Sequence, residues 1–392
     1  MNPFEINEEV EIAQPGVRRI RSGHLWVYAS DVVREPEEAE PPIVRVVDGH
    51  RNILGHAFYS KASQIRLRLF TRDSEAPTAQ LLTERVRAAV GRRAGLLRPD
   101  SGCRLVFGEA DLLPSVVVDR YAGTLVLQTL SAGADALKPL LVDILRQLLD
   151  PPGILERNDV KARRLEGLEE VRGPLWGAVP EQVRIVENDL RFVVDLSGGQ
   201  KTGFFLDQRE NRIAAANYAT GRALDCFTNT GAFALHFASR CGSVLAADVS
   251  GAALEQARIN AEINGITNLE LREANAFDLL RELERSGERF DTICLDPPAF
   301  AKNRASLPGA LAGYKEINLR AMKLLKPEGV LVTSSCSFHL AEEDFAGLLH
   351  QAARDAHRYL QVIERRGQAS DHPVLTGMPE TRYLKCFILR VL

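Results

Sequence analysis

Short apolar runs alternate with helical segments along residues 191–392, and this alternation constrains the fold more than any other feature of the sequence. The runs with strand character are RALDCFT, SVLAADV, NLELRE, FDTICLD and GVLVTSSC, each followed by a segment with helical apolar spacing. Such alternation predicts an α/β fold with right-handed crossovers and a doubly wound parallel sheet. Two more strands, YLQVIERR and YLKCFILRVL, are expected near the end. Ligands of such sheets bind beyond the carboxyl ends of the strands.

Two other segments precede this α/β region. Residues 1–75 contain short alternating runs with turns at Pro41-Pro42 and Asp48-Gly49-His50, a pattern typical of a small β-barrel. Residues 76–190 combine the helical runs TAQLLTERVRAAVGRRAGLL and DALKPLLVDILRQLL with the strand-like runs LPSVVVDRY, GTLVLQTL and ILERND. This mixture predicts a small α+β unit. We therefore expect three domains, at 1–75, 76–190 and 191–392.

The charge balance and the cysteines exclude several classes of protein. The 392 residues carry 49 Lys+Arg and 52 Asp+Glu, a formal net charge of −3, so any nucleic-acid binding must come from local basic patches. The six dispersed cysteines lack the close spacing of zinc ligands, which predicts no metal site and no disulfide framework. No signal-peptide pattern opens the chain, and no run approaches the ~20 apolar residues of a membrane span. These features indicate a reduced, cytoplasmic protein.

Two basic segments are candidates for such patches. The stretch PGVRRIRSGHLWVYASDV sets cations beside aromatic rings, a combination suited to RNA because cations contact phosphate and rings stack on bases. Its candidates are Arg18, Arg19, Arg21, His24 and Trp26, with Tyr28 nearby. The alternative is that Trp26 and Tyr28 are core residues with solvated arginines outside them. The second segment is the helical run bearing Arg85, Arg87, Arg92, Arg93 and Arg98, which faces either RNA or solvent.

The segment DCFTNTG lies where a predicted strand ends and a helix begins, and it is a candidate cofactor site. Asp248 ends the next strand 23 positions after Asp225, a spacing that suits an acid bound to a ribose diol. Only one glycine is present, so the pyrophosphate cradle of an NAD site is absent, and a nucleoside cofactor without phosphate, such as S-adenosylmethionine, fits better. As alternatives, Asp225 is a turn former and Asp248 a helix cap. The candidates here are Asp225, Phe227, Thr228, Gly231, Asp248 and Val249.

Two further motifs end the fourth and fifth predicted strands. In Asp296-Pro297-Pro298 the prolines would fix a rigid corner that holds the Asp296 carboxylate against a flat base. Cys336, in the run SSCS, is a candidate nucleophile beside that corner, although free cysteines are more often buried small hydrophobes. No triad accompanies this thiol, which argues against an acyl-transfer hydrolase.

The segment GGQKTGFFLDQR, residues 198–209, resembles a flexible loop that closes on a ligand, and it does not match a P-loop. The alternative is a turn that leads into a helix. We assign Phe205 and Gln208 to the cofactor side, and Lys201 and Arg209, with Lys302, to the RNA side. The thiols expected in the core are Cys226, Cys241, Cys294 and Cys386.

Taken together, the motifs GGQKTGFFLDQREN, LDCFTNTGAFALHFA, DPPAFAK and SSCS resemble, in this order, those of bacterial 23S rRNA 5-methylcytosine methyltransferases of the RlmI/RlmO type. GHLWVY is similar to the family's PUA signature, and FGEADLLPSVVVDRY to the start of its central domain. The resemblance covers nearly the whole chain. It implies a PUA β-barrel, a central α+β domain and a Rossmann-like class I methyltransferase domain.

The resemblance also implies an activity. S-adenosylmethionine would be the cofactor, 23S rRNA the partner, Cys336 the nucleophile that adds to cytosine C6, and Asp296 the acid that binds the base near N3. Asn275 or Asp278 would contact the adenine. In many related enzymes a second cysteine follows the prolines, but Ala299 stands there in this sequence. Three alternative functions stay open: a guanine methyltransferase that needs no thiol, a polyamine-synthase-type transferase, and a non-catalytic RNA-binding assembly factor. The oligomeric state is also open, with a homodimer as one possibility.

Overall fold

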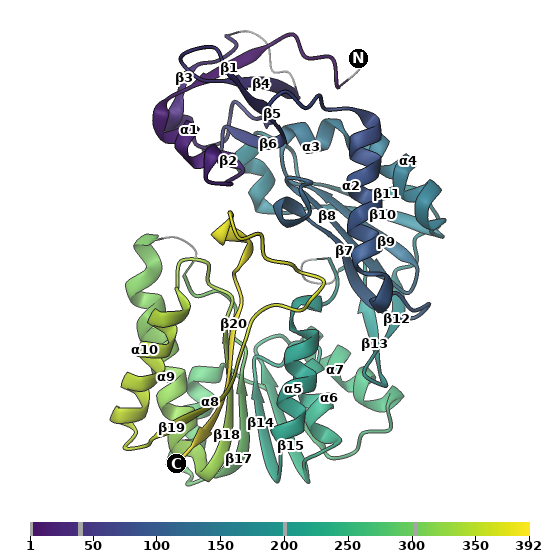
Figure 1. The fold of residues 1–392 in the computed structure, drawn as a ribbon. Coiled ribbons are helices and arrows are strands. Elements are labelled where there is room, and N and C mark those ends of the chain that lie inside the picture. The colour runs from purple at the N-terminus through teal and green to yellow at the C-terminus, as the bar shows by residue number, and fades with distance from the viewer. Residues whose placement is uncertain (1–2, 38–41, 199–201, 302–303) are drawn as a thin grey trace. The chain divides into compact units, whose positions relative to one another are not determined.

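The computed structural model describes residues 3–37, 42–198, 202–301 and 304–392, and Figure 1 labels its helices and strands. The chain forms two compact units. The first comprises Met1–Ile185, Val194–Leu206 and Asp371–Thr381, and the second Val186–Val193, Asp207–Ser370 and Arg382–Leu392. The division into three domains at 75 and 190 stays a prediction.

A six-stranded sheet forms the N-terminal part of the first unit. Its order is β2-β6-β5-β4-β1-β3, so β2 and β3 are edges and the barrel is open. The predicted hairpin is confirmed, because the Asp48 carboxylate accepts the backbone N–H groups of His50 and Asn52 and closes the turn between β4 and β5. The elements are β1 (Glu9–Ile12), α1 (Gln14–Arg21), β2 (Trp26–Val27), β3 (Val32–Arg34), β4 (Ile43–Val47), β5 (Ile53–Tyr59) and β6 (Leu67–Arg72).

A second sheet of five strands, ordered β11-β10-β9-β8-β7, completes the first unit. Leu82 and Val86 of α2 and Leu141 and Leu145 of α4 pack in its apolar core. The predicted strands and helices are confirmed, while β7 and β11 were not predicted. The elements are α2 (Ala79–Arg92), β7 (Gly102–Phe107), β8 (Val116–Tyr121), β9 (Thr124–Thr129), α3 (Ala132–Ala136), α4 (Lys138–Leu149), β10 (Gly153–Asn158) and β11 (Val171–Gly177). The hairpin β12 (Gln182–Glu187) and β13 (Leu190–Asp195) follows.

The second unit contains the predicted doubly wound sheet, in the order β16-β15-β14-β17-β18-β20-β19 (Figure 1). The first five strands in this order are parallel, and β20 inserts antiparallel between β18 and β19. The strands are β14 (Arg222–Cys226), β15 (Ser243–Asp248), β16 (Leu269–Glu273), β17 (Phe290–Leu295), β18 (Leu325–Ser335), β19 (Leu360–Arg366) and β20 (Lys385–Val391).

Helices cover both faces of this sheet, as the alternating pattern predicts. Leu280, Ile317 and Phe345 of α8, α9 and α10 fill one apolar layer, and Ala215 and Phe237 of α5 and α6 fill the other. The helices are α5 (Arg209–Tyr218), α6 (Ala232–Ala238), α7 (Gly251–Ile263), α8 (Ala276–Arg285), α9 (Leu307–Leu324) and α10 (Glu342–Asp355).

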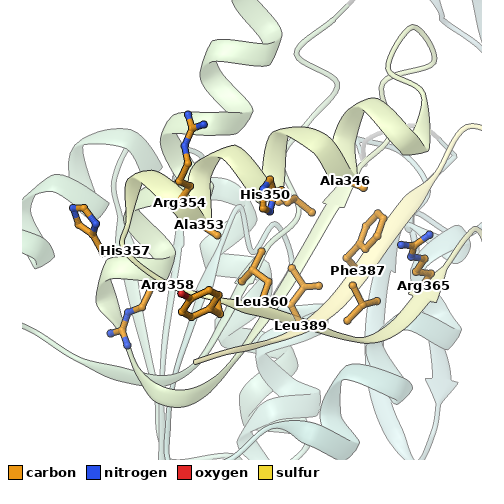
Figure 2. A pocket seen from close by; sticks show the side chains of 13 residues that line it. Ala346, His350, Ala353, Arg354, His357, Arg358, Leu360, Arg365, Phe387 and Leu389 are labelled. Carbon is orange, nitrogen blue, oxygen red and sulfur yellow. The ribbon is translucent and has the colours of Figure 1, made fainter.

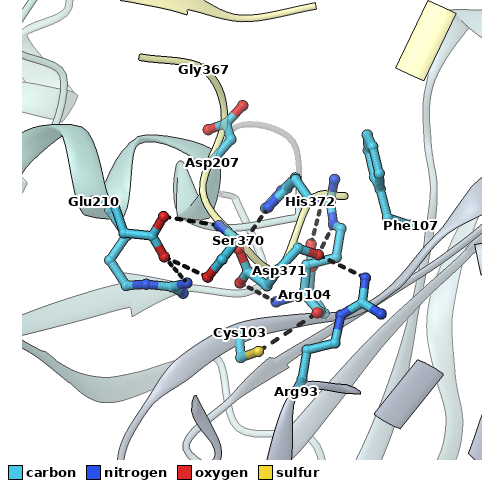
Figure 3. A network of polar contacts seen from close by, with 12 residues as sticks. Arg93, Cys103, Arg104, Phe107, Asp207, Glu210, Gly367, Ser370, Asp371 and His372 are labelled. Atoms are coloured by element: carbon cyan, nitrogen blue, oxygen red, sulfur yellow. Dashed lines mark hydrogen bonds and ion pairs between the residues drawn. The ribbon is translucent and has the colours of Figure 1, made fainter. Parts of the chain in front are cut away.

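The segment Asp371–Thr381 belongs to the first unit although it lies between two strands of the second. In Figure 3 the Asp371 carboxylate accepts the Arg104 backbone N–H at 2.9 Å, and its backbone carbonyl accepts the Arg93 guanidinium at 2.9 Å. His372 is within hydrogen-bond distance of the Asp371 carboxylate and contacts the ring of Phe107. Buried polar contacts therefore fix the loop between β19 and β20.

Candidate active site

The loop after β14 has an unusual backbone. Phe227, Asn229 and Gly231 have positive φ angles of 65°, 51° and 83°. Three residues therefore adopt the left-handed backbone conformation before α6 begins. A side chain at Gly231 would be strained by its φ and would place a Cβ only 2.8 Å from the Leu235 side chain. This conformation forms a tight turn at the carboxyl end of the strand, where a doubly wound sheet binds its ligand.

The Asp225 carboxyl supports that loop from inside. Its Oδ2 accepts the Thr228 hydroxyl at 2.6 Å and the Ala234 backbone N–H at 3.0 Å. The side chain is buried, and burial, with the negative charge of Asp296 as a smaller cause, raises the pKa of Asp225 to about 7. We therefore infer that Asp225 shapes the loop through a carboxyl that is largely neutral below neutral pH.

Asp248 lies at the tip of β15 beside the same loop. Its Oδ2 accepts the Asn229 backbone N–H at 2.9 Å, and its Oδ1 accepts the Ser250 backbone N–H at 3.0 Å. These bonds fix the carboxylate in one orientation. Val249 beside it is 64% exposed, which is high for an apolar side chain.

The two candidates for the adenine differ in their surroundings. The Asn275 side chain caps α8 by accepting the Phe277 backbone N–H at 2.9 Å. Asp278 lies in the first turn of that helix, is exposed, and is paired with Arg281 at 3.4 Å. Asn275 therefore stabilises the start of α8, and Asp278 lies on the surface. The contact of either residue with the adenine stays a prediction.

The proline corner begins where β17 ends. The Asp296 Oδ1 accepts the Gln208 side-chain amide at 2.8 Å, and the Gln208 carbonyl oxygen accepts the Asn211 amide at 2.6 Å. Gln208 is buried, so this chain of amides holds Asp296 in place. β17 pairs with β14 on one side and with β18 on the other, which brings Asp225, Asp296 and the SSCS run to the same edge of the sheet.

Cys336 follows β18 and is half-buried, whereas the other five cysteines are buried. Its Sγ lies 4.0 Å from the carbonyl oxygen of Pro297, within the proline corner. The predicted proximity of the thiol to this corner is therefore found. The predicted burial of Cys226, Cys241, Cys294 and Cys386 is also confirmed.

Buried hydroxyl groups hold the two motifs together. The Tyr314 hydroxyl is 3.0 Å from both the Ser335 and the Ser337 hydroxyl oxygens. Ser337 in turn accepts the backbone N–H of Ala301, on the segment that follows the prolines. Tyr314 therefore positions the loop that carries Cys336.

Lys385 is a residue that the sequence analysis missed. It opens β20 opposite Ser335 of β18, and it is buried. Its Nζ donates to the carbonyl oxygens of Ser337 at 2.7 Å and Tyr383 at 2.9 Å. The ammonium group thus lies directly behind the Cys336 loop. The lysine near the start of the mainly apolar run YLKCFILRVL was the available signal, because a buried lysine in a strand needs partners.

The charge of Lys385 is coupled to Cys336. Burial lowers the pKa of Lys385 to about 8, the negative charges on Cys336 and Glu342 act in the opposite direction, and the positive charge of Arg382 lowers the pKa further. Because a Coulomb attraction is mutual, a charged Lys385 favours the thiolate form of Cys336.

The residues predicted to bind RNA fall into two groups. Arg19 forms an ion pair with Asp31 and stacks on Tyr28, and buried His24 is 3.0 Å from the Glu380 carboxylate. The Trp26 indole donates to Glu109 at 2.9 Å. These three side chains have clear structural contacts within the first unit.

The remaining RNA candidates differ in exposure, and two of them lie outside the described residues. Arg18 and Arg21 are exposed on α1, and Arg21 is 3.8 Å from Asp48. Arg209 is mostly buried and lies 3.2 Å from Glu210. Lys201 and Lys302 lie outside the described residues, and Phe205 is half-buried in the first unit.

The second basic segment is α2 with the residues after it. Arg93 is buried and forms a bidentate ion pair with Asp111, and Arg85 donates to backbone carbonyl groups. Arg87 and Arg98 have no ion-pair partner among the described residues. Some arginines of this segment therefore make contacts within the first unit, and Arg87 and Arg98 stay candidates for RNA contacts.

The donors and acceptors of this site fit a nucleoside cofactor without phosphate. Asp248 offers carboxylate acceptors for ribose hydroxyls, and the single glycine at 231 provides no cradle for a pyrophosphate. In residues 3–37, 42–198, 202–301 and 304–392, no helix is long and apolar enough to cross a membrane. The same residues contain no group of three His, Cys, Asp or Glu side chains placed to hold a metal.

Comparisons with known proteins agree with this site. Residues 10–72 match the model of a PUA-like domain, and residues 170–389 match the model of S-adenosylmethionine-dependent methyltransferases. The fold resembles that of a Streptococcus mutans protein assigned as such a methyltransferase, with a TM-score of 0.83, 19% identity and coverage of 97% and 99% of the two chains. A methyltransferase solved with SAH aligns with a TM-score of 0.85 and 20% identity, over 97% and 99% of the chains. The fold and site thus define an S-adenosylmethionine-dependent methyltransferase.

More similar relatives narrow the assignment. Ribosomal RNA large subunit methyltransferase I of Tolumonas auensis is 43% identical over 382 residues, which cover 94% of this chain and 96% of the relative. The protein of that name from Klebsiella pneumoniae is 40% identical over 378 residues, 94% of each chain. The chain belongs to the ribosomal RNA large subunit methyltransferase I family.

Proposed function

We propose that the protein methylates C5 of a cytosine in 23S rRNA through a covalent adduct between Cys336 and C6 of the base. The observation that carries this proposal is the 4.0 Å separation between the Cys336 Sγ and the Pro297 carbonyl oxygen. This distance supports the proposal because the adduct requires the Cys336 thiol beside the corner that carries Asp296. The names of the relatives support rRNA as the substrate, and an rRNA substrate favours a cytoplasmic enzyme.

The chemistry explains why a thiol is needed. Cytosine C5 is a poor nucleophile, whereas addition of the Cys336 thiolate to C6 turns C5 into an enamine-like carbon. When bound, S-adenosylmethionine supplies an electrophilic methyl group. Asp296, held by Gln208, would hydrogen-bond the base near N3 and stabilise the adduct. Methyl transfer to C5 leaves S-adenosylhomocysteine. The C5 proton then passes to solvent and the bond between C6 and Sγ breaks, which releases the methylated base and restores the Cys336 thiolate.

Two other residues would support the reaction. We assign Lys385 to the stabilisation of the thiolate, because its ammonium group is bonded to the carbonyl oxygen of Ser337, next to Cys336. We assign Asp248 to the ribose hydroxyls of the cofactor, since its carboxylate is fixed at the carboxyl end of β15. Both residues act at the ends of strands or beside them, as expected for this fold.

Substitution of the thiol tests the proposal. Cys336→Ala should abolish methyl transfer to 23S rRNA purified from a strain lacking the gene, while cofactor binding measured by calorimetry should persist. Cys241→Ala, which removes a buried thiol, is the matched control and should stay active. Bisulfite sequencing of the product should locate a single 5-methylcytosine. Near-normal turnover of Cys336→Ala would instead support methylation of guanine, which needs no thiol.

A further inference from the structure

A groove lies in the second unit between α10 and the outer strands β19 and β20 (Figure 2). Its volume is about 720 Å³, within the usual range of ligand pockets. Apolar side chains form its floor, among them Leu349 of α10, Leu360 of β19, and Phe387 and Leu389 of β20. The groove is separate from the site around Cys336, and none of its lining residues has a role in the proposed reaction.

Arginine and histidine side chains surround this floor. Arg354, Arg358, Arg365, His350 and His357 all line the groove, and no Asp or Glu is among its lining residues. Figure 2 shows these side chains along α10, the following turn and β19. A surface with cations on its rim and no carboxylate is complementary to a polyanion.

One nearby acidic group neutralises this rim in part. Asp355, the acid next to Arg354 in the chain, is 3.5 Å from Arg354, but it is closer to Lys315, at 2.7 Å. Arg358 donates to the backbone carbonyl of Leu325, and Arg365 stacks on the Phe387 ring at 5.7 Å. Their contacts fix the guanidinium groups, and both keep their net positive charge.

An exposed aromatic ring lines the groove. Tyr359 is 81% exposed, and the backbone of this residue is hydrogen-bonded in both directions to Leu392. Val362, on the edge strand β19, is 48% exposed. An exposed aromatic ring beside arginines and an apolar floor is the combination that proteins use to stack bases and contact phosphates of single-stranded nucleic acid.

We propose that this groove binds a single-stranded segment of the substrate RNA, with phosphates at the arginines and bases on Tyr359 and the apolar floor. The inference rests on the proposed function. The position of the groove relative to Cys336 in the chain favours RNA over an acidic protein as its ligand. The helix α10, which lines the groove, begins six positions after Cys336, and its 14 residues extend about 21 Å. RNA in the groove would thus flank the target base along one helix.

Charge reversal and removal of the ring test the proposal. The double variant Arg354→Glu/Tyr359→Ser should bind a 23S rRNA transcript about tenfold more weakly than the parent in filter binding, with a smaller salt dependence between about 50 and 200 mM salt. Arg285→Glu, the matched control, reverses an exposed arginine at the end of α8, outside the groove, and should change binding less than twofold. Affinity for S-adenosylmethionine should be unchanged in both variants.

The outcomes separate this inference from the function on which it rests. Equal RNA affinity and equal salt dependence in the double variant and the parent would overturn the groove as an RNA site. Sedimentation gives a second contrary outcome. If the parent is a dimer and the double variant is a monomer with unchanged RNA affinity, the groove binds a second copy of the chain and the RNA proposal is overturned. Failure of the parent to methylate 23S rRNA would refute the proposed function, whereas the binding comparison judges the groove independently of turnover.

Discussion

The Cys336 Sγ and the Pro297 carbonyl oxygen lie 4.0 Å apart although 39 positions separate the two residues in the chain. Adjacent parallel strands β17 and β18 bring them together, and the hydroxyl groups of Ser335, Tyr314 and Ser337 hold their loops. A thiol and a rigid acidic corner therefore face each other at the edge where the fold binds ligands.

Lys385 should set the reactivity of the thiol. Lys385→Met removes the buried cation, so the pKa of Cys336 should rise and alkylation of Cys336 by iodoacetamide should shift to higher pH. The shift should be seen mainly below about pH 8, because above this pH Lys385 itself loses its charge. Mass spectrometry of the labelled peptide gives the rates. Identical pH profiles in parent and variant would remove Lys385 from this role.

Asp248 should contribute to cofactor binding. Asp248→Asn keeps the size of the side chain but removes the charge offered to the ribose hydroxyls, a change worth about 1.5–3 kcal/mol for a charge-assisted bond. Calorimetry should therefore show S-adenosylmethionine affinity reduced by roughly tenfold or more. Asp278→Asn, at an exposed site, distinguishes the two candidates for the adenine: reduced affinity would favour Asp278, and unchanged affinity would favour Asn275.

The arginines of α1 should differ in their roles. Arg18 and Arg21 are exposed, so Arg18→Ala/Arg21→Ala should weaken RNA binding and reduce the salt slope by about two. Arg19→Ala should instead lower the melting temperature, because it breaks the ion pair with Asp31. Filter binding and thermal melts distinguish these effects, and a double variant that retains the parent's salt slope would rule out α1 as a phosphate contact.

Asp225 should make stability depend on pH. Burial raises the pKa of Asp225 from its ordinary value of 3.8 to about 7, so the fold favours the protonated form. The free energy of unfolding should therefore fall as pH rises from about 4 to about 7. Asp225→Asn stays neutral, so its melting temperature should fall less between pH 5 and pH 8 than that of the parent. Parallel melting curves across this range would contradict a raised pKa.

Much of the candidate site could be predicted because it depends on local order in the sequence. Asp225 and Asp248 lie in the last two residues of their strands, and Asp296 and Cys336 directly follow theirs. Parallel strands bring these carboxyl ends to the same edge. Lys385 could not be placed in this way. It comes from the antiparallel strand β20, and the loop before that strand has no periodic pattern that would fix its register.

The first unit shows a different limit of sequence reasoning. The pattern of cations and rings in residues 15–32 is equally compatible with RNA contacts and with internal pairing. The structure shows that Arg19 pairs with Asp31, 12 positions away, and that Trp26 donates to Glu109, 83 positions away. Such long-range pairs leave no local signature. The strands β7 and β11 were missed as well, because arginines and glycines interrupt their apolar runs.

Covalent trapping tests the central claim most directly. An rRNA fragment with 5-fluorocytidine at the target position should form a denaturation-resistant complex with the parent and with Cys241→Ala in the presence of S-adenosylmethionine, because fluorine cannot leave as a proton does. Cys336→Ala should form none. A trapped complex with Cys336→Ala, or no complex with a parent enzyme that methylates the unmodified fragment, would contradict Cys336 as the nucleophile.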